Sequence, residues 1–357
     1  MKDFQKTAVI LFQLGGPDSP AAVRPFLYNL FCDPDIINFP GAFLARKALA
    51  RFIANRRAPH VAERYNLIGG RSPIIDLTLA QAAALESRLN PAIPSKVFVA
   101  MRYWHPFTEE VVERISGNSY SRAILLPLYP QFSKATTLSS LNEWHRKTSS
   151  RQRLQSTFIC CFYNHPLYIK AIVENINSVY AKFASHHPEE IDLVFSAHGV
   201  PVGLIREGDP YQLQIEETVR LVMEEGKWKS PHYLCYQSKV GPARWLKPSL
   251  PETIEELARS GRRHLLVIPI AFVTDHIETL HEINIEAREE ARKLGIVQFE
   301  MMPALNNNPL FIECLADLVR RSVSNELLHL PSCRNLSDQK PHRPAPRLCP
   351  YCDTDRR

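Results

Sequence analysis

The chain has 357 residues, of which 45% are hydrophobic and 22% charged, a composition typical of folded proteins. This length exceeds what one hydrophobic core usually accommodates, so it favours two domains. The formal net charge of +6 comes from Lys and Arg that are scattered except around 46–57, which argues against nucleic acid as a partner.

The N-terminal residues do not indicate secretion. Residues 7–14 (TAVILFQL) lack a small-residue cleavage site, and we predict that they form the first strand rather than a signal peptide. No apolar run approaches the roughly 20 residues that span a bilayer. Eight cysteines without a secretory signal favour a reducing compartment, so we expect a cytoplasmic protein.

Short apolar runs alternate with amphipathic stretches along the chain. We predict strands at 7–14, 97–101, 122–128, 156–161, 191–196, 232–237, 264–270 and 297–301. Helical periodicity occupies 20–31, 43–55, 76–89, 107–116, 166–184, 210–225, 251–259, 275–293 and 309–325. This alternation indicates βαβ units and parallel sheets that are covered on both faces.

An internal similarity indicates two related halves, because residues 122–129 (RAILLPLY) resemble 264–271 (HLLVIPIA). We therefore predict an α/β fold of two similar, doubly wound parallel-sheet domains with a cleft between them. The expected boundaries are 1–140 for the first domain, 141–300 for the second, 301–328 for a final helix that packs back towards the first domain, and 329–357 for a tail. The tail is rich in Pro, Arg and Lys and cannot bury a core.

Several loops have a composition that suits a flat ligand. Gly15 and Gly16 follow the first predicted strand without the G-x-G-x-x-G spacing or the lysine of nucleotide-binding loops, and they would let something flat approach the backbone. Segments 65–73, 102–105 and 236–245 mix aromatic residues with Arg and Ser. That mixture suits a large apolar ligand with acidic substituents, and it equally suits ordinary loop packing.

Residues 40–57 are predicted to form a basic amphipathic helix. An apolar stripe that includes Phe43, Leu49 and Phe52 is surrounded by Arg and Lys. Such a helix can rest on an anionic membrane surface. The same pattern fits an ordinary helix whose stripe packs on the core, and the composition alone does not choose between them.

Two predicted strands end in titratable residues. His198 follows the apolar run 191–196, and Gly199 and Pro201 then force a turn. A single histidine in this place fits catalysis or a structural role equally well. Open α/β sheets bind ligands at the carboxyl ends of their strands, so this position is a candidate site.

The run 265–270 leads to a dense set of acids and imidazoles that can carry protons or handle a metal ion: Asp275, His276, Glu278, His281 and Glu282. His276 and His281 are five residues apart, so they align only on a π turn. This spacing differs from the H-E-x-x-H of zinc proteases. The structural alternative is a solvated, acidic helix start.

These motifs together resemble the ferrochelatase family, whose members insert Fe²⁺ into a porphyrin to make haem. The matching segments are 14–17 (LGGP), 65–73 (YNLIGGRSP), 129–133 (YPQFS), 136–142 (TTLSSLN), 196–198 (SAH), 208–211 (GDPY), 237–242 (QSKVGP), 272–280 (FVTDHIETL) and 308–311 (NPLF). The resemblance covers nearly the whole chain. It implies the Rossmann-like chelatase fold and a lyase that inserts Fe²⁺ into protoporphyrin IX, forming protohaem with release of two protons, the last step of haem biosynthesis.

The resemblance also implies roles for individual residues. His198 and Glu278 match the opposed catalytic pair, and the metal or its protons would also meet Asp275, His276, Glu282 and Glu286 on an acidic, π-distorted path. The expected porphyrin-binding residues are Leu14, Arg56, Arg57, Tyr65, Ser72, Arg102, Tyr129, Trp245 and Phe272. Segment 31–57 matches the apolar lip that touches the inner face of a membrane, and the protein would be a monomer or a homodimer.

The chemistry of metalation agrees with this assignment. Removing two pyrrole N–H protons calls for acceptors such as a neutral imidazole and carboxylates. Iron that must be passed on is better held by one histidine and carboxylates than by a thiolate cage. We therefore assign His198 as proton acceptor or metal contact, Glu278 as its partner, and Asp275, Glu282 and Glu286 as a relay.

Some family members also carry a [2Fe–2S] cluster on one internal cysteine and three near the C-terminus. Cys333, Cys349 and Cys352 would supply the three, although their spacing departs from that of animal members. The internal ligand would be Cys160 or Cys161, because Lys134 stands at the internal position of animal members. A lone C-x-x-C also fits a zinc half-site or free thiols.

Two further alternatives keep the same residues. In the first alternative the substrate is coproporphyrin, which has more carboxylates than protoporphyrin. In the second the protein is a tetrapyrrole or metal carrier without turnover. Two opposed titratable groups favour an enzyme, because a carrier need not remove protons.

Overall fold

The computed structural model describes residues 6–35, 42–118, 120–149, 155–183, 186–239, 241 and 243–324. The chain divides into two compact units. The first contains the described residues up to Tyr129, those from Ser133 to Cys160, and those from Leu315 onward, and the second contains 130–132 and 161–314. The first unit thus extends beyond the boundary expected at residue 140, because the helix and the strand that follow residue 138 belong to its layers.

The first unit is built on a four-stranded parallel sheet with the order β2-β1-β3-β4. The strands are β1 (Lys6–Gln13), β2 (Ser95–Met101), β3 (Tyr120–Pro127) and β4 (Ser156–Phe158). Val9 of β1 lies between Val97 of β2 and Ile124 of β3. All of β1 after Lys6 is buried, as expected for a parallel strand that is covered on both faces.

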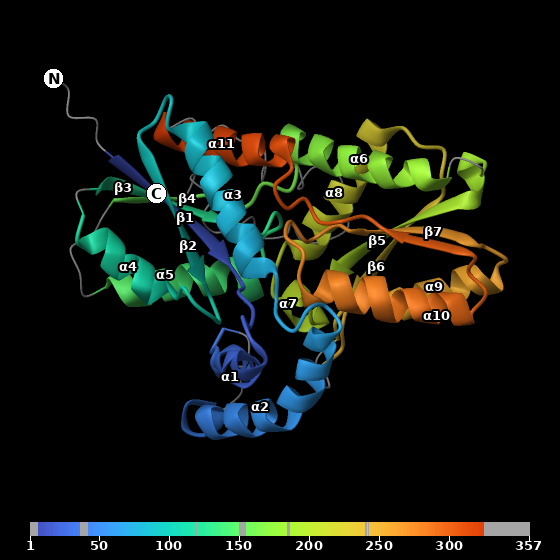
Figure 1. The fold of residues 1–357 in the computed structure, drawn as a ribbon, viewed down its shortest axis with the longest axis horizontal. Coiled ribbons are helices and arrows are strands. Elements are labelled where there is room, and N and C mark those ends of the chain that lie inside the picture. Colours follow the sequence, from blue (N-terminus) through green and yellow to red (C-terminus); the bar gives the residue numbers. More distant parts are fainter. Residues whose placement is uncertain are drawn as a thin grey trace. The chain divides into compact units, whose positions relative to one another are not determined.

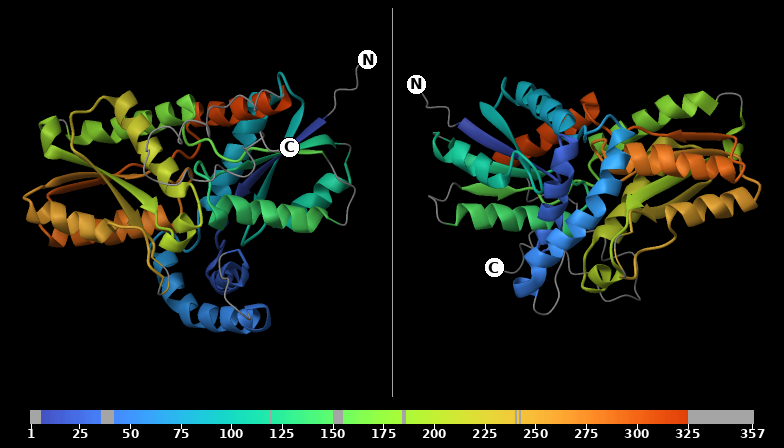
Figure 2. Two further views of the ribbon diagram at one scale, coloured as in Figure 1. Left: turned by 180° about the vertical axis from the view of Figure 1, so that it is seen from behind. Right: turned by 60° about the horizontal axis from the view of Figure 1, so that its bottom comes forward.

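The helices of the first unit are α1 (Val23–Cys32), α2 (Ala42–Asn66), α3 (Ile74–Leu89), α4 (Thr108–Ser116) and α5 (Ser139–Thr148), with a short 3₁₀ helix at Pro20–Ala22 and a π-helix, η2, at Lys134–Leu138. In Figures 1 and 2, α4 and α5 lie on one face of the sheet and α3 on the other. Phe12, Leu125 and Trp144 belong to the core under α4 and α5.

The second unit repeats this arrangement with the strand order β6-β5-β7-β8, again all parallel. Its strands are β5 (Ile191–His198), β6 (His232–Gln237), β7 (His264–Pro269) and β8 (Gln298–Met301). In both sheets the first strand of the unit is central and lies between the second and the third. The internal similarity in the sequence falls on β3 and β7, which hold equivalent places. The prediction of two similar doubly wound parallel sheets is confirmed.

The helices of the second unit are α6 (Pro166–Tyr180), α7 (Val202–Arg206), α8 (Tyr211–Gly226), α9 (Leu250–Arg259) and α10 (Arg288–Lys293), with 3₁₀ turns at Ala181–Phe183 and Pro188–Glu190 and a long π-helix, η5, at Glu278–Ala287. Helices α9 and α10 cover one face of the sheet, and α6 and α8 cover the other (Figure 1). Ile254 of α9, Ile283 of η5 and Val267 of β7 pack in the core on the side of the sheet that α9 and α10 cover. The last helix, α11 (Pro309–Val323), crosses the division at Leu315.

One helix is longer than its sequence predicts. Helix α2 continues to Asn66, past the end expected at residues 55–57, and includes Pro59. A proline inside a helix removes one backbone hydrogen bond to the residue four positions earlier, which is Asn55. Asn55 is exposed, so water can take that bond and the helix can continue.

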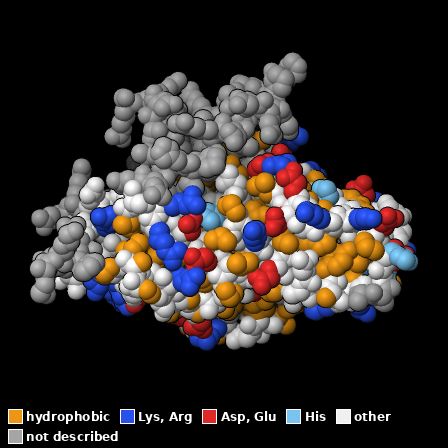
Figure 3. Space-filling model, turned by 90° about the horizontal axis from the view of Figure 1, so that it is seen from above, with side chains coloured by type: hydrophobic (Ala, Val, Ile, Leu, Met, Phe, Trp, Pro, Cys, Tyr) orange, Lys and Arg blue, Asp and Glu red, His pale blue; other side chains and the backbone are white. Residues whose placement is uncertain are grey.

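Among the helices that the structure describes, none is both long and apolar enough to cross a membrane. The face drawn in Figure 3 shows acidic and basic side chains interspersed with hydrophobic ones.

Candidate active site

The site is built around His198, the last residue of β5. The strand before it is buried, whereas 35% of the His198 side chain is exposed. Gly199 then lets two neighbours approach the backbone, because a Cβ there would lie 2.9 Å from the Gln237 carbonyl oxygen and 3.3 Å from the Trp245 ring. The Tyr211 hydroxyl donates to the His198 carbonyl at 3.0 Å. These contacts hold the backbone at His198 and Gly199 in place at the carboxyl end of the sheet.

Glu278, the first residue of η5, lies opposite His198. Its Oε2 is 2.7 Å from Nδ1 of His198, although the two residues are 80 positions apart in the chain. Only 17% of the Glu278 side chain is exposed. The fold of the second unit therefore brings together the two residues that we expected to be the catalytic pair.

Each member of this pair changes the acidity of the other. Burial disfavours the charged imidazole, but the Glu278 carboxylate outweighs this effect and raises the pKa of His198 above its usual value. Burial likewise disfavours the charged carboxylate, but His198 outweighs this and lowers the pKa of Glu278. Because Glu278 occupies Nδ1, Nε2 is the ring nitrogen that can accept a proton, and it is a stronger base than in a free histidine.

Two more residues of the predicted set lie beside the pair. His276 is buried, its Nδ1 is 3.0 Å from the Thr274 carbonyl oxygen, and its Nε2 is 3.9 Å from Oε2 of Glu278. The Phe272 ring lies 5.0 Å from the His276 ring and meets the His198 ring edge-on at 6.5 Å. Phe272 thus provides an apolar wall that touches both imidazoles.

Asp275 has a different environment. Its carboxylate accepts hydrogen bonds from the Thr279 hydroxyl at 2.9 Å, the Ala304 amide at 3.2 Å and the Asn306 side chain at 2.7 Å. None of these partners belongs to the His198–Glu278 pair. These hydrogen bonds hold the chain in place just before η5. The relay role expected for Asp275 stays a prediction, because none of these contacts links it to His198 or Glu278.

The remaining carboxylates follow Glu278 along η5 at intervals of four residues. The Ser238 hydroxyl donates to Oε2 of Glu282 and lies 3.5 Å from Oε2 of Glu278. Glu286 is 45% exposed, and its Oε2 is 3.6 Å from Nδ1 of the buried His281. The acidic groups therefore run from a buried position at Glu278 towards solvent at Glu286. A π-helix is present, as the histidine spacing suggested, but only His281 belongs to it, because η5 begins at Glu278 and His276 precedes it.

No three His, Cys, Asp or Glu side chains in the described ranges converge into a group that could hold a metal ion. His198 and Glu278 offer a weaker, two-residue contact. Such a contact suits a metal that is a substrate and must leave with the product.

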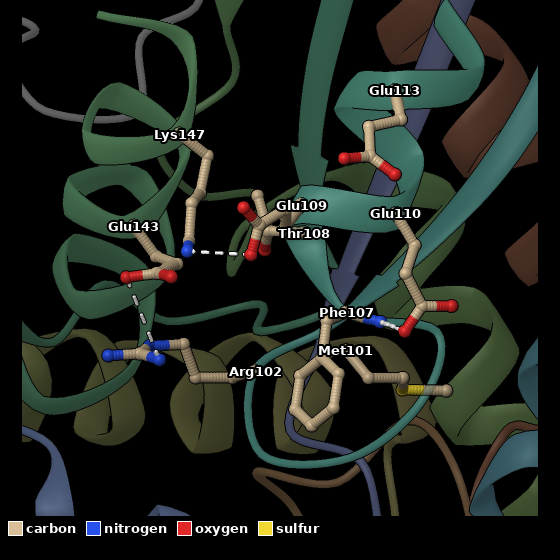
Figure 4. Close-up of a pocket in the computed structure, with 9 residues that line it drawn as sticks. All are labelled: Met101, Arg102, Phe107, Thr108, Glu109, Glu110, Glu113, Glu143 and Lys147. Atoms are coloured by element: carbon tan, nitrogen blue, oxygen red, sulfur yellow. Dashed lines mark hydrogen bonds and ion pairs between the residues drawn. The ribbon is translucent and has the colours of Figure 1, made fainter.

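The predicted porphyrin residues of the first unit lie at the carboxyl ends of its own strands, on helix α2 and, for Ser72, in the loop between α2 and α3. Arg102 follows β2 and lines a cavity of ≈ 320 Å³ between α4 and α5 (Figure 4). Its guanidinium is 3.0 Å from Oδ1 of Asp33, donates to the Ser139 hydroxyl at 2.9 Å, and lies 4.0 Å from Glu143. Arg102 is therefore already bonded within its unit.

The other members differ widely in exposure. Ser72 and Tyr65 are buried, and Ser72 packs so closely on Gly16 that a Cβ at Gly16 would lie 2.5 Å from its hydroxyl oxygen. Arg56 and Arg57 are exposed on α2, and the Arg57 guanidinium lies 5.6 Å from the centre of the Phe31 ring. The rest are partly buried: Leu14 and Tyr129 in the first unit, and Trp245 and Phe272 in the second.

The cysteine predictions fall mostly outside the described residues, where Cys333, Cys349 and Cys352 lie. Cys160 and Cys161 are buried, and Cys161 accepts a hydrogen bond from Gln214.

Sequence reasoning missed two polar residues that contact η5. Gln237, at the end of β6, donates to the Glu278 carbonyl at 3.0 Å and accepts from the Ser196 hydroxyl at 2.7 Å. Ser238 follows it. Gln237 and Ser238 could have been found from their position at the end of a predicted strand, inside the segment QSKVGP.

Comparison with known proteins agrees with the family resemblance that the sequence motifs indicated. The family model "Ferrochelatase" matches residues 6–323. The ferrochelatase of Geotalea uraniireducens is 49% identical over 323 residues, covering 90% of this chain and 99% of that protein. The chain belongs to the ferrochelatase family. Ferrochelatase of Trichodesmium erythraeum is 45% identical over 338 residues, covering 93% of this chain and 85% of that protein.

Membership in the ferrochelatase family makes the protein an enzyme, a lyase of haem biosynthesis with Fe²⁺ as a substrate. The resemblance inferred from the sequence is confirmed. The fold is shared with the sirohydrochlorin chelatase SirB from Bacillus subtilis subspecies spizizenii, with a TM-score of 0.50 at 11% identity, over 90% of this chain and 96% of that one.

Proposed function

We propose that this ferrochelatase inserts Fe²⁺ into protoporphyrin IX and forms protohaem with release of two protons. The observation that carries this proposal is the His198–Glu278 pair, with 2.7 Å between its nitrogen and oxygen atoms, at the carboxyl end of the central strand of the second sheet. Anaerobic addition of Fe²⁺ and protoporphyrin IX to the purified protein should convert the free-base absorption bands into haem bands. Absence of catalysed conversion contradicts the proposal.

In this mechanism His198 accepts the two pyrrole protons in turn at Nε2 and passes each on to the carboxylates of η5, and Glu278 stabilises the imidazolium that forms each time. The lone pair that the lost proton leaves on the pyrrole nitrogen then binds iron. Glu282 and Glu286 extend from Glu278 towards solvent and would carry protons away from the pair. Phe272 packs beside His198, and we assign it as an apolar surface against the macrocycle.

Protoporphyrin is favoured over coproporphyrin by the small number of unpaired cations among the predicted porphyrin residues. The guanidinium of Arg102 is bonded to Asp33 and Ser139, which leaves the exposed Arg56 and Arg57 for substrate carboxylates. The additional carboxylates of coproporphyrin would need further partners. A comparison of kcat/KM for the two porphyrins tests this assignment, and a higher value for coproporphyrin overturns it.

The carrier alternative predicts binding without turnover. A carrier has no need for a basic imidazole paired with a carboxylate, so the same pair argues for the enzyme. Porphyrin that binds stoichiometrically but is not metalated by Fe²⁺ would support the carrier.

We also propose that segment 31–57 rests on the inner face of a membrane and makes the enzyme a peripheral, cytoplasmic protein. In the described part of this segment, Phe52 is 65% exposed and Leu49 is 37% exposed, while Ala50 and Ala54 face the core. Residues 36–41 lie outside the described residues. The exposed apolar stripe between arginines favours a membrane contact over core packing.

Gel filtration would distinguish the monomer from the homodimer.

The [2Fe–2S] cluster stays a prediction, because its three C-terminal ligands lie outside the described residues. Buried thiols at Cys160 and Cys161 are of the right chemical type for the fourth ligand. Charge-transfer absorption and acid-labile sulfide in anaerobically purified protein would support the cluster. Their absence, or their persistence in Cys349→Ser, would contradict it.

A further inference from the structure

The end of β6 makes contacts with η5 that the mechanism above does not use. Gln237 and Ser238 both reach the first turns of this π-helix, Gln237 through the Glu278 carbonyl and Ser238 through the side chains of Glu278 and Glu282. Gln237 is itself fixed by the buried Ser196 hydroxyl of β5. A chain of hydrogen bonds thus joins the sheet to the backbone carbonyl of Glu278, and Ser238 alone reaches the carboxylates of Glu278 and Glu282.

The backbone of Ser238 has an unusual conformation. Its φ is +66°, in the left-handed region that residues other than glycine seldom adopt. Such conformations persist only where the surrounding structure holds them, and they occur often at functional sites. Because of this conformation, the side chain of Ser238, which follows the end of β6, reaches the carboxylates of Glu278 and Glu282.

We propose that Ser238 is a positioning residue for the metalation reaction. Its hydroxyl holds Glu282 beside Glu278, so that both carboxylates stay on the side of η5 that faces β6 and the His198 imidazole. A hydroxyl has a single hydrogen, and it is donated to Glu282, while the 3.5 Å distance to Glu278 keeps that oxygen in contact without competing for its bond to His198.

A π-helix gives a reason for such a contact. It is wider than an α-helix and occurs mostly in short pieces, because its backbone geometry is less favourable. Glu278 and Glu282 stand in the first turns of η5, where a small rotation would move both carboxylates away from His198. Contacts from a neighbouring strand remove that freedom, and a misplacement of about 1 Å at a reacting group can cost ~100-fold in rate.

The left-handed backbone supplies a discriminating experiment. Ser238→Gly removes the hydroxyl and relieves the backbone strain, whereas Ser238→Ala removes the hydroxyl and keeps the strain. The proposal predicts a similar loss of kcat in both variants, about 10- to 100-fold, the usual effect of losing one hydrogen bond to a charged group. The KM for Fe²⁺ should rise, and that for protoporphyrin IX should change little. Relief of the backbone strain should give Ser238→Gly a higher melting temperature than Ser238→Ala.

Lys227 provides the matched control. It is exposed at the C-terminal cap of α8 in the same unit, and its φ is +55°. Lys227→Gly should raise the melting temperature in the same way and leave kcat and both KM values unchanged.

This inference rests on the proposed function, and the experiment separates their failures. A wild-type protein that does not metalate protoporphyrin IX contradicts the proposed function. A wild type that metalates it together with a fully active Ser238→Gly variant contradicts only the role of Ser238. If Ser238→Gly does not fold, the kcat of Ser238→Ala decides the question, and a value equal to that of the wild type overturns the proposal.

Discussion

The two units have the same sheet topology but different groups at the ends of their central strands. In the second unit β5 ends in His198, which faces Glu278 of the π-helix that follows β7. In the first unit β1 ends in Gln13, and the π-helix that follows β3 has the sequence KATTL, without a carboxylate or a histidine. The fold therefore supplies a strand end and a π-helix twice, and we propose that the side chains confine the proton chemistry to the second unit.

The first unit uses its equivalent region for internal bonding. Asp33, whose side chain is fully buried, accepts hydrogen bonds from Tyr103 and Ser139, both at 2.6 Å, and pairs with Arg102. This network joins the end of α1 to the loop after β2 and to α5. We infer that loss of these bonds would mainly reduce stability, whereas loss of the bonds in the second unit would mainly reduce turnover.

The largest effect is expected from His198→Ala. Removal of the proton acceptor should lower kcat by about 10²- to 10⁴-fold, the usual contribution of a general base, while protoporphyrin IX still binds. Steady-state metalation assays and fluorescence titration with the porphyrin measure the two effects. His232→Ala is the matched control, because His232 is exposed at the opposite end of the same sheet. Near-normal turnover in His198→Ala would contradict the proposal that the second unit supplies the proton acceptor.

Glu278→Gln should have a smaller effect. The amide keeps the size of the side chain but cannot stabilise the imidazolium, so kcat should fall by about 10- to 100-fold, which is the loss of a charge-assisted hydrogen bond. The variant should fold normally, since its backbone carbonyl still accepts from Gln237. A loss of folded protein in place of a loss of kcat would mean that Glu278 is structural, as Asp33 is in the first unit.

Asp33→Asn should affect stability rather than chemistry. It should lower the free energy of unfolding at pH 7 by about 1.5–3 kcal/mol, the range for hydrogen bonds to a charged group. Urea denaturation measures this change, and kcat per folded molecule should stay within about tenfold of the wild type. A large loss of kcat at wild-type stability would contradict the contrast between the units.

The same residue gives a pH dependence of stability. Burial would raise the pKa of Asp33, but Arg102, Ser139 and Tyr103 outweigh it and lower that pKa below its usual value. The stabilisation is therefore complete above the usual pKa of an aspartate, about 4, and is lost as the pH falls through the lower value of the folded state. The difference in unfolding free energy between wild type and Asp33→Asn should shrink below about pH 4. A difference that is constant down to pH 2 would contradict this assignment.

The smallest effect concerns the exposed stripe of α2. Phe52→Ser should reduce cosedimentation with anionic liposomes without changing the melting temperature, because the Phe52 side chain is 65% exposed. Val297→Ser is the control, since Val297 is 76% exposed on the second unit. Equal liposome binding by wild type and both variants would exclude Phe52 from a membrane contact.

Much of the fold could be predicted from the sequence, because buried parallel strands leave continuous apolar runs. All eight predicted strands are present within a few residues of their expected bounds. Helix α2 was harder, because Pro59 normally indicates an end, whereas here the residue that loses its hydrogen bond, Asn55, is exposed and water can take that bond. Two α-helices of the described chain were missed. Helix α5 has only two hydrophobic residues among its ten, Leu141 and Trp144, and the five residues of α7 show no clear periodicity.

The site was predictable to the level of residue type and place, but not of hydrogen-bond partners. The acids and histidines after 265–270 indicated a site, and the resemblance paired His198 with Glu278. The roles of Asp275 and Arg102 depend on which neighbours bond them, and those neighbours, such as Asn306 and Asp33, are remote in the sequence. Ser238 was missed because a left-handed backbone in a residue other than glycine leaves no sequence pattern.

The pH dependence of single-turnover metalation in the wild type and in Glu278→Gln tests the central claim most directly. Porphyrin is bound first, Fe²⁺ is added anaerobically, and the conversion rate is recorded from pH 5 to pH 9. If the carboxylate raises the pKa of His198, the rate of the wild type falls on acidification at a higher pH than that of Glu278→Gln, in which the imidazole loses its charged partner. An acid limb at the same pH in both proteins would contradict a His198 base that is activated by Glu278.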